Sequence, residues 1–296
     1  MTEFDYIDWL RKRTPSASRV RIGPGDDCAV LDWSGTPCLV TTDVLLEGRH
    51  FDLAEAGARR VGRKAMAVNL SDIAAMAGQP VAAVVGVALP KAGGRKLGEE
   101  LYLGMREMAD AFDTALVGGD TNSWDGPLVI SVTVLGEAVG HGAVTRAGAK
   151  PGDWLLVTGP LGGSLAGKHL DFTPRIREAI QLHALVELHA MIDISDGLAS
   201  DVHHICEESL CGAVLRAETI PLSPAAKSLE NALGDGEDFE LAFAVSPTDG
   251  ERLIREQPVT GIQLAHVGEF VANGFWIEEK GVRRKLQSQG WVHELD

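Results

Sequence analysis

Positive charge is scarce in this sequence. Lys and Arg together number 27 against 42 Asp and Glu, which gives a formal net charge of −15 and a pI near 5.0. Nucleic acids and anionic membranes are recognised through basic patches, so neither partner is expected. A small phosphorylated substrate stays compatible with this charge if metal ions supply the positive charge.

Long apolar runs, a leader-like N-terminus and paired cysteines are also missing. No stretch approaches the roughly 20 uncharged apolar residues of a membrane span, and the first residues lack a basic segment followed by an apolar core. The four cysteines, Cys28, Cys38, Cys206 and Cys211, include no C-x-x-C pair. We therefore expect a cytoplasmic protein with reduced thiols, neither exported nor spanning a membrane.

The length and composition fit two ordinary globular domains. The chain has 296 residues, of which 45% are hydrophobic and 23% are charged. Residues 140–153 contain four Gly and one Pro, so they form the best boundary candidate. We predict an N-terminal domain over residues 1–139 and a C-terminal domain over residues 149–296. Strand and helix patterns mix without the alternation of a barrel, which predicts an α/β or α+β fold with mixed sheets flanked by helices.

Hydrophobic periodicity predicts the individual elements. In a helix predicted at residues 54–78, Ala65, Val68, Asp72 and Met76 fall at three- and four-residue steps. Asp72 is therefore predicted on a largely apolar, inward face. Further helices are predicted at residues 97–113, 162–170, 174–190 and from 198, and strands at residues 39–43, 81–89, 115–120, 128–135, 154–158, 191–194, 240–245 and 263–271.

What the chain does contain is a series of short Asp-bearing segments beside glycine or at the end of an apolar run. Two carboxylates about 4 Å apart repel by roughly 4 kcal/mol at an effective dielectric near 20, so several of them in one cleft need a cation. Oxygen ligands without His or Cys favour a hard divalent ion, and Mg2+ usually sits between carboxylates and substrate phosphates. The sequence therefore predicts a Mg2+-dependent enzyme acting on phosphates. The segments are Gly23-Pro-Gly-Asp-Asp-Cys-Ala-Val30, Thr41-Thr-Asp43, Asn69-Leu-Ser-Asp72, Gly118-Gly-Asp120, Asp193-Ile-Ser-Asp-Gly197 and Gly234-Asp-Gly-Glu-Asp238.

Each of these aspartates also has a local interpretation. Asp26 and Asp27 could belong to a turn, and Asp196 could cap the helix that follows it. Asp72 and Asp193 weaken this interpretation, because a helix interior or an apolar strand gives a carboxylate nothing to cap and burying an unpaired charge is costly. Taken jointly, the segments favour a metal cluster.

Four further features have two interpretations each. The run from Gly162 to His169 comes close to a phosphate-binding P-loop, but its last position lacks Ser or Thr, so a glycine-rich turn that could line a ligand through backbone N–H groups is favoured. His50 is either a surface or capping residue or a phosphate ligand. Arg146 is either solvated or a bidentate phosphate contact. Trp291 either packs at a core edge or stacks on a flat ligand.

Several segments, taken in order, carry a resemblance to a known family. They are Gly25-Asp-Asp27 with Ala29-Val30, Thr41-Thr-Asp43 through His50-Phe51, Ala67-Val-Asn-Leu-Ser-Asp-Ile-Ala-Ala-Met76, Gly118-Gly-Asp-Thr121, Thr145-Arg-Ala-Gly148, Gly152-Asp153 with Thr158-Gly-Pro-Leu-Gly162, Asp193-Ile-Ser-Asp-Gly-Leu198 and Gly236-Glu-Asp-Phe-Glu-Leu241. Together they extend over nearly the whole chain. Their order and wording resemble the thiamine-monophosphate kinases of the aminoimidazole-ribonucleotide synthetase-like superfamily.

The resemblance implies ATP-dependent phosphorylation of thiamine monophosphate to thiamine diphosphate, the last step in making that cofactor. It also implies a two-domain fold, and a homodimer built largely from N-terminal domains that bind ATP and Mg2+. Carried over by position, it implies several Mg2+ ions held by Asp27, Thr41, Thr42, Asp43, Asp72, Asp120, Asp193 and Asp196, with Asp26 ranked below Asp27. It implies ATP contacts from Tyr102, Gly119, Asp120, Arg146 and Ser195, and substrate contacts from His50, Glu237 and Trp291.

Transfer to a phosphate acceptor suits the residues themselves. The acceptor oxygen is largely ionised near pH 7, because the second pKa of a phosphate is about 6, so no strong general base is required. This agrees with nine histidines at no recognisable spacing and with the lack of a Ser-His-Asp or Cys-His pattern. Direct in-line transfer without a phospho-enzyme is the resulting hypothesis.

Two alternatives stay open at this point. One is a sister ATP-dependent enzyme, such as the purine-synthesis enzyme or the hydrogenase-maturation protein. The latter is expected to end in a Cys-bearing tail, whereas this chain ends in Trp291-Val-His-Glu-Leu-Asp296. The other alternative is a non-catalytic module that binds nucleotide or metal.

Overall fold

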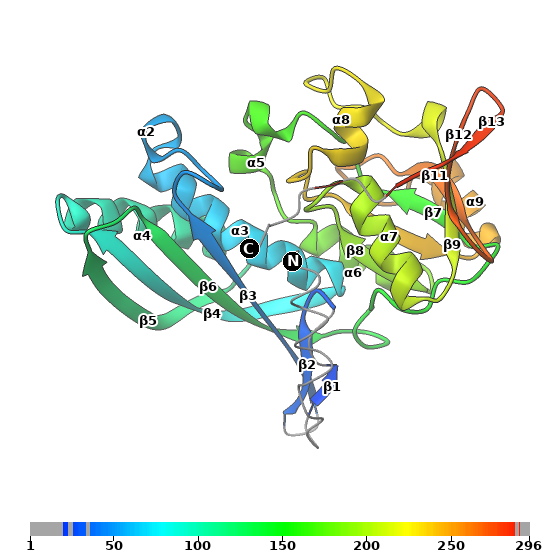
Figure 1. Ribbon diagram of the computed structural model, residues 1–296. Helices are drawn as coiled ribbons and strands as arrows, with labels where there is room; N and C mark the ends of the chain where they lie inside the picture. Colours follow the sequence, from blue (N-terminus) through cyan, green and yellow to red (C-terminus); the bar gives the residue numbers. More distant parts are fainter. Residues whose placement is uncertain (1–19, 23–25, 34–35, 288–289, 291–296) are drawn as a thin grey trace.

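The structure is a computed structural model that describes residues 20–22, 26–33, 36–287 and 290. Two β-sheets dominate it, one from each half of the chain (Figure 1). Both sheets are mixed and carry helices, so the predicted fold class is confirmed. Whether residues 1–139 and 149–296 each fold as an independent domain stays a prediction.

The N-terminal sheet has the strand order β1-β2-β3-β6-β4-β5. Neighbouring strands are antiparallel except β4 and β5, which run parallel because helix α4 (Gly94–Ala111) crosses over between them. Helices α3 (Ala58–Ala75) and α4 pack together on the sheet. The strands are β1 (Val20–Ile22), β2 (Ala29–Trp33), β3 (Thr36–Leu46), β4 (Gly78–Pro90), β5 (Ala115–Trp124) and β6 (Val129–Ala138).

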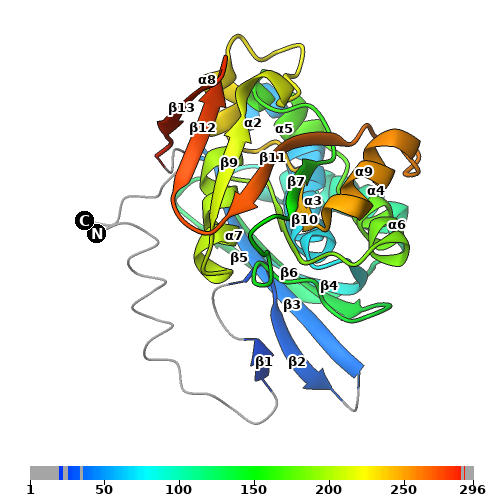
Figure 2. The same cartoon turned by 90° about the vertical axis from the view of Figure 1, so that its right-hand side faces the viewer.

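The C-terminal sheet has the strand order β13-β12-β9-β11-β7-β10-β8, and it faces the viewer in Figure 2. Its strands are β7 (Trp154–Val157), β8 (Ala190–Asp193), β9 (Gly212–Arg216), β10 (Leu241–Val245), β11 (Ala265–Val271), β12 (Phe275–Glu279) and β13 (Val282–Lys285). The helices of this half are η1 (Ser164–Ala166), α5 (Lys168–Asp171), α6 (Ile176–Leu185), α7 (Leu198–Glu208), η2 (Ala217–Thr219), α8 (Leu229–Gly234) and α9 (Pro247–Glu256).

Helix α3 is the wall that the two halves share. It contacts β3, β4 and β6 on one side and α5, α6 and β8 on the other. Of its 18 residues 13 are buried, including Ala65 and Met66, and Met76 just beyond its end is buried as well. A helix that is buried nearly all round has little solvent to face, so its polar side chains must find partners inside the protein.

Several predicted boundaries are wrong. The single helix predicted at residues 54–78 is two helices, α2 (Leu53–Ala56) and α3, because Gly57 adopts φ 77° between them. Gly78 already belongs to β4. Residues 162–170 contain only the short helices η1 and α5, and the helix predicted at 174–190 ends at Leu185. The strand predicted at 115–120 continues to Trp124, and the strands β1, β2, β9, β12 and β13 were not predicted.

All four cysteines are free thiols in the structure. Among the helices of the described residues, none combines the length and the apolar character that crossing a bilayer requires.

Helices α3 and α4 approach backbone to backbone. A Cβ on Gly104 would lie 1.8 Å from the Arg59 carbonyl oxygen, and a Cβ on Gly62 would lie 2.1 Å from the Leu101 carbonyl oxygen. Only glycine fits both positions, so the crossing fixes how α3 lies on the sheet.

We expect Gly104→Ala to lower the free energy of unfolding by about 1–3 kcal/mol, because the two backbones must separate. Thermal melting followed by circular dichroism measures this loss. Gly98→Ala is the control on the same helix, since its new Cβ would meet the Leu89 side chain at 3.2 Å. That side chain can rotate away, so an equal loss in both variants would contradict the close crossing.

Candidate active site

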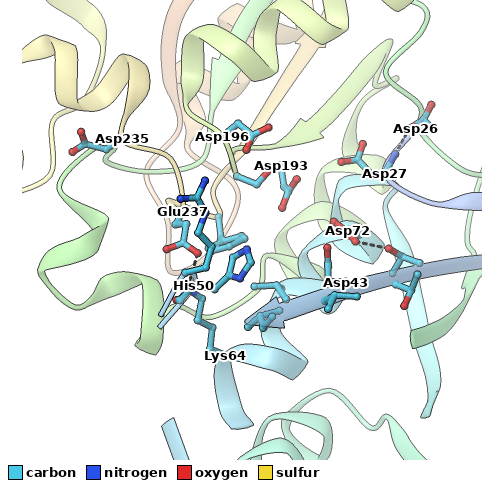
Figure 3. A pocket seen from close by; sticks show the side chains of 18 of the residues that line it. Asp26, Asp27, Asp43, His50, Lys64, Asp72, Asp193, Asp196, Asp235 and Glu237 are labelled. Atoms are coloured by element: carbon cyan, nitrogen blue, oxygen red, sulfur yellow. Dashed lines mark hydrogen bonds and ion pairs between the residues drawn. The ribbon is translucent and has the colours of Figure 1, made fainter. Parts of the chain in front are cut away.

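A cavity of about 490 Å3 opens where the two halves of the chain meet. Its walls come from β3, α3, the loop after β8 and the turn before β10. Figure 3 shows several acidic side chains around one end and His50, Lys64 and Glu237 together at the other. The predicted site residues that line the cavity are Asp27, Thr41, Thr42, Asp43, His50, Asp72, Arg146, Asp193, Ser195, Asp196 and Glu237.

The acidic end is built from three separate elements. Asp27 precedes β2, Asp72 lies in α3 and Asp193 ends β8, yet one carboxylate oxygen of each lies within 4.8 Å of the others. Burial raises the pKa of Asp72 and of Asp193 well above the usual range, and neighbouring carboxylates raise both further. Burial and the charge of Asp27 also raise the pKa of Asp26 to about 7. This end of the cavity therefore favours a bound cation.

Two polar residues of α3 hold the segments that carry the acidic residues, one through a carboxylate and one through the backbone. Ser71 Oγ donates a hydrogen bond of 2.6 Å to Asp193 Oδ2, which joins the two halves of the chain. Asn69 Oδ1 accepts a hydrogen bond of 3.0 Å from the backbone N–H of Asp43. Neither residue was predicted to act at the site. The available signal was the Asn-Leu-Ser-Asp run itself, since its polar residues stand in an otherwise apolar stretch over residues 65–75.

Thr41 and Thr42 lie side by side in β3 but have different partners. Thr41 donates its hydroxyl to Asp72. Thr42 donates its hydroxyl to the Val132 carbonyl oxygen at 3.0 Å and accepts one from Thr133 at 2.9 Å. Successive side chains of a strand face opposite sides, so Thr41 supports the acidic centre while Thr42 belongs to the sheet surface beside it.

Arg146 binds a carboxylate in this structure. Its Nε and Nη2 donate to Asp27 Oδ2 and Oδ1 at 3.0 and 3.1 Å, and its backbone N–H donates to Asp26 Oδ2 at 3.2 Å. Burial lowers the pKa of Arg146, but the contact with Asp27 raises it more, so the guanidinium stays charged. The interpretation of Arg146 as a merely solvated residue is wrong. Its bidentate geometry is the one that arginine also uses for phosphate.

The other end of the cavity joins His50 and Glu237 through a buried lysine. Lys64 Nζ donates to the His50 carbonyl oxygen at 2.7 Å and to Glu237 Oε1 at 2.5 Å. His50 Nδ1 in turn accepts the backbone N–H of Leu46 at 2.9 Å, so its imidazole supports a turn at the cavity wall. Lys64 was not predicted. It precedes Asp72 by two four-residue steps, which puts both on one face of α3.

The loop after β8 brings Ser195 and Asp196 to the cavity. The interpretation of Asp196 as the cap of α7 is wrong, because the cap position is Gly197. Asp201 Oδ2 accepts the backbone N–H groups of both Asp196 and Gly197 at 3.1 Å. The Ser195 carbonyl oxygen accepts the backbone N–H of Glu237 at 2.7 Å. This hydrogen bond sets the two cavity-lining segments beside each other.

The P-loop interpretation of residues 162–169 is also wrong. Lys168 Nζ contacts Glu240 Oε1 at 2.9 Å, so it is committed to a buried ion pair. The backbone N–H groups of Gly162 and Gly163 are taken by the carboxylates of Asp238 and Asp235. The segment is a glycine-rich turn whose amides serve the protein itself.

Three predicted residues lie apart from this cavity. Tyr102, Gly119 and Asp120 line a second hollow of about 720 Å3 on α4, β4 and β5. Trp291 lies outside the described residues. The predicted set of Mg2+ and ATP residues is therefore not gathered in one place within a single chain.

The strand register shows how far apart the two places are. Asp120 pairs with Gly86, Gly86 with Ser131, and Ser131 with Val44, which lines the first cavity. Three interstrand steps amount to roughly 14 Å. Since ligands of one Mg2+ ion lie about 2.1 Å from it, Asp120 and the β3 residues of the same chain cannot share an ion.

In the presence of a chelator, we expect the melting temperature to rise as the pH is lowered from about 8.5 to about 6.5. The folded-state pKa values of Asp26 and Asp238 are raised to about 7, and burial raises the pKa values of Asp72 and Asp193 well above their unfolded values. The folded protein therefore takes up protons that the unfolded chain does not bind, and its stability is lost as the pH rises through these values. Burial lowers the folded-state pKa values of His169, His183, His204 and His266, so the unfolded chain binds protons at these residues first and the rise in melting temperature should level off toward pH 6.5.

Melting curves with EDTA and with Mg2+ across this range measure the effect. Mg2+ should reduce the slope, because a bound cation stabilises the ionised carboxylates. Asp193→Asn should flatten the EDTA profile. Equal slopes with EDTA and Mg2+ would contradict the cation site.

Comparison with known proteins identifies the family of each half of the chain. The family model described as AIR synthase related protein, N-terminal domain, matches residues 25–138, and its C-terminal counterpart matches residues 150–275. The thiamine-monophosphate kinase of Rhodopirellula baltica is 40% identical over 310 aligned residues, covering 98% of this chain and 97% of its own length.

Two solved structures are also similar over nearly their full length. AaThiL complexed with AMPPCP and TMP has a TM-score of 0.85 and 28% identity, with 99% of this chain and 97% of that one covered. The thiamine-monophosphate kinase of Stenotrophomonas maltophilia K279a has a TM-score of 0.73 and 32% identity, with 95% and 99% covered. The chain belongs to the thiamine-monophosphate kinase family, within the AIR synthase related proteins.

Proposed function

We propose that this protein transfers the γ-phosphoryl group of ATP to thiamine monophosphate, in a Mg2+-dependent reaction that yields thiamine diphosphate and ADP. The observation that carries the proposal is the convergence of Asp27, Asp72 and Asp193 in a cleft between the two halves of the chain. The relatives support the same activity, since they are thiamine-monophosphate kinases and one similar structure holds AMPPCP, an ATP analogue, together with TMP.

The residues of the acidic end fit Mg2+. They offer carboxylate and hydroxyl oxygens, the hard ligands that this ion prefers, and the raised pKa values of Asp72 and Asp193 express the charge that a cation would relieve. When bound, Mg2+ supplies the positive charge that phosphate groups need in an acidic cavity. The proposed ligands in this cavity are Asp27, Thr41, Asp43, Asp72, Asp193 and Asp196, together with Thr42, which would have to contribute its backbone carbonyl oxygen because its hydroxyl is bonded to Val132 and Thr133.

The protein's own part in the reaction is to position two anions. We assign Arg146 and Ser195, which both line the cavity, to the phosphates of ATP. Glu237 and His50 face the thiamine end, where a carboxylate complements the cationic thiazolium ring. The acceptor phosphate oxygen is already ionised near pH 7, so direct in-line transfer requires no protein base.

The second hollow supports a site completed by a partner subunit. Strand β5 lies at the sheet edge, with Val117 61% and Trp124 44% exposed, and an exposed apolar edge strand favours pairing or burial against another chain. We propose a homodimer in which Tyr102, Gly119 and Asp120 of one subunit complete the ATP and Mg2+ site of the other. This arrangement accounts for the 14 Å separation within one chain, roughly three interstrand spacings.

The free thiols of the four cysteines suit the cytoplasm, which we propose as the location. A sister activity or a non-catalytic binding module are the alternatives. Product analysis separates them from the kinase.

We expect purified protein mixed with Mg-ATP and thiamine monophosphate to form thiamine diphosphate, detected by chromatography. Unphosphorylated thiamine is the parallel control, and EDTA should abolish the reaction. ATP consumption without thiamine diphosphate would indicate a sister enzyme, and tight ATP binding without turnover would indicate a binding module. Protein that becomes labelled by γ-labelled ATP would contradict direct transfer.

The shared site predicts that two inactive variants restore each other. Asp43→Asn and Asp120→Asn should each lose most activity while keeping the fold. After subunit exchange of an equal mixture, about half of the dimers are hybrids with one intact site each, so about a quarter of wild-type activity should return. A mixture no more active than its two parents would contradict the shared site.

A further inference from the structure

Lys64 is a charged residue in a place where charge is rarely found. Its side chain is only 1% exposed and lies in the middle of α3, among apolar and small residues. Lysine is almost never fully buried without a partner, because removing an ammonium group from water is costly. Burial lowers the pKa of Lys64, and the charge of Glu237 opposes that shift. The protein therefore holds a buried ammonium group at the cavity wall despite the cost of removing it from water.

The partners of Lys64 come from both walls of the cavity. Its Nζ donates to the carbonyl oxygen of His50, in the turn after β3, and to Oε1 of Glu237, which is 173 residues away in the sequence. These are the two described residues that the proposed function assigns to thiamine monophosphate.

The segment that carries Glu237 is held in an unusual backbone conformation. Glu237 and Phe239 both adopt the left-handed region, with φ 52° and 49°. Such a conformation costs non-glycine residues of order 1–3 kcal/mol and persists only where the surroundings enforce it. Backbone hydrogen bonds from Glu237 to Ser195 and from Phe239 to Ile194 do so here, at 2.7 and 2.8 Å. These hydrogen bonds keep Glu237 at the cavity wall, with its side chain 24% exposed.

We infer that Lys64 is a positioning residue for thiamine monophosphate, which fixes the Glu237 carboxylate and the His50 turn at the spacing that the substrate requires. This inference rests on the proposed function and adds a residue that acts through Glu237 rather than on the reacting atoms. One side of the carboxylate is bound by Lys64, so its orientation toward the cavity is set before the cationic ring arrives.

Two other contacts between α3 and the C-terminal half allow this role to be distinguished from a purely structural link between the two halves. Arg60 pairs with Asp171, and Arg63 donates to the Leu170 carbonyl oxygen at 3.1 Å. Both contacts join α3 to α5, but neither arginine lines the cavity. Arg60→Met therefore removes an ion pair between the halves without touching the proposed site, and it is the matched control for Lys64→Met.

The test is a double-mutant cycle in steady-state kinetics with full-length protein. Lys64→Met keeps the length of the side chain and removes its charge. It should raise the KM for thiamine monophosphate about tenfold, the loss expected when a charge-assisted contact behind the ligand is removed. The KM for Mg-ATP should stay within about twofold. Once Glu237→Gln is present, Lys64→Met should add less than about twofold, because the two residues act as one unit.

Three results would overturn the inference. They are additive effects of Lys64→Met and Glu237→Gln, an equal rise in the KM for Mg-ATP, and an equal rise in the KM for thiamine monophosphate in Arg60→Met. If Lys64→Met is unfolded at the assay temperature, Lys64→Gln replaces it in the same cycle, since an amide can still donate to both acceptors. Lys64→Gln should raise the KM for thiamine monophosphate less than Lys64→Met does, and its effect must likewise be non-additive with that of Glu237→Gln. Wild-type protein that forms no thiamine diphosphate would overturn the proposed function itself, whereas additivity in an active enzyme overturns only the role of Lys64.

Discussion

The mutual repulsion of buried carboxylates is the constraint on which the rest of this structure depends. Asp27, Asp72 and Asp193 come from three elements, and their oxygens meet within 4.8 Å. Such a cluster is unfavourable in an apolar interior unless hydrogen bonds and cations compensate for it. The protein provides the hydrogen bonds from Ser71 and the positive charge from Arg146. The proposed Mg2+ would supply the remaining charge and turn an electrostatic cost into a phosphate-binding site.

Helix α3 is the element that makes this arrangement rigid. It lies between the two halves of the chain, and its glycine crossing with α4 fixes its position on the N-terminal sheet. Because it is buried nearly all round, each polar residue on it has a specific partner. Asn69 holds the backbone of β3, Ser71 holds Asp193, and Lys64 holds Glu237. One helix thereby sets the acidic end and the opposite end of the cavity at the same time.

The predictions from sequence succeeded where chemistry is local and failed where neighbours decide. The alternation of residues predicted most strands of both sheets, but it did not predict that β6 lies between β3 and β4. That strand order alone separates Asp120 from the acidic cavity. Gly57 shows the same limit on a smaller scale, since a helical pattern continues through it while its backbone turns with φ 77°. Lys64 was missed because a lysine is normally interpreted as a solvated residue.

The sequence by itself determined the order of motifs that marks the family, and it showed Asp-bearing segments rich in oxygen donors without a Ser-His-Asp or Cys-His pattern. These properties depend on residue types and short spacings, which can be read directly from the sequence. Only the tertiary structure decided which side chains share a cavity, because those contacts join distant parts of the chain. Ser71 and Asp193 are 122 residues apart and Lys64 and Glu237 are 173 apart. Electrostatic energies depend on distance in space. The ion pair of Arg146 with Asp27 and that of Lys64 with Glu237 could therefore be found only in the folded chain.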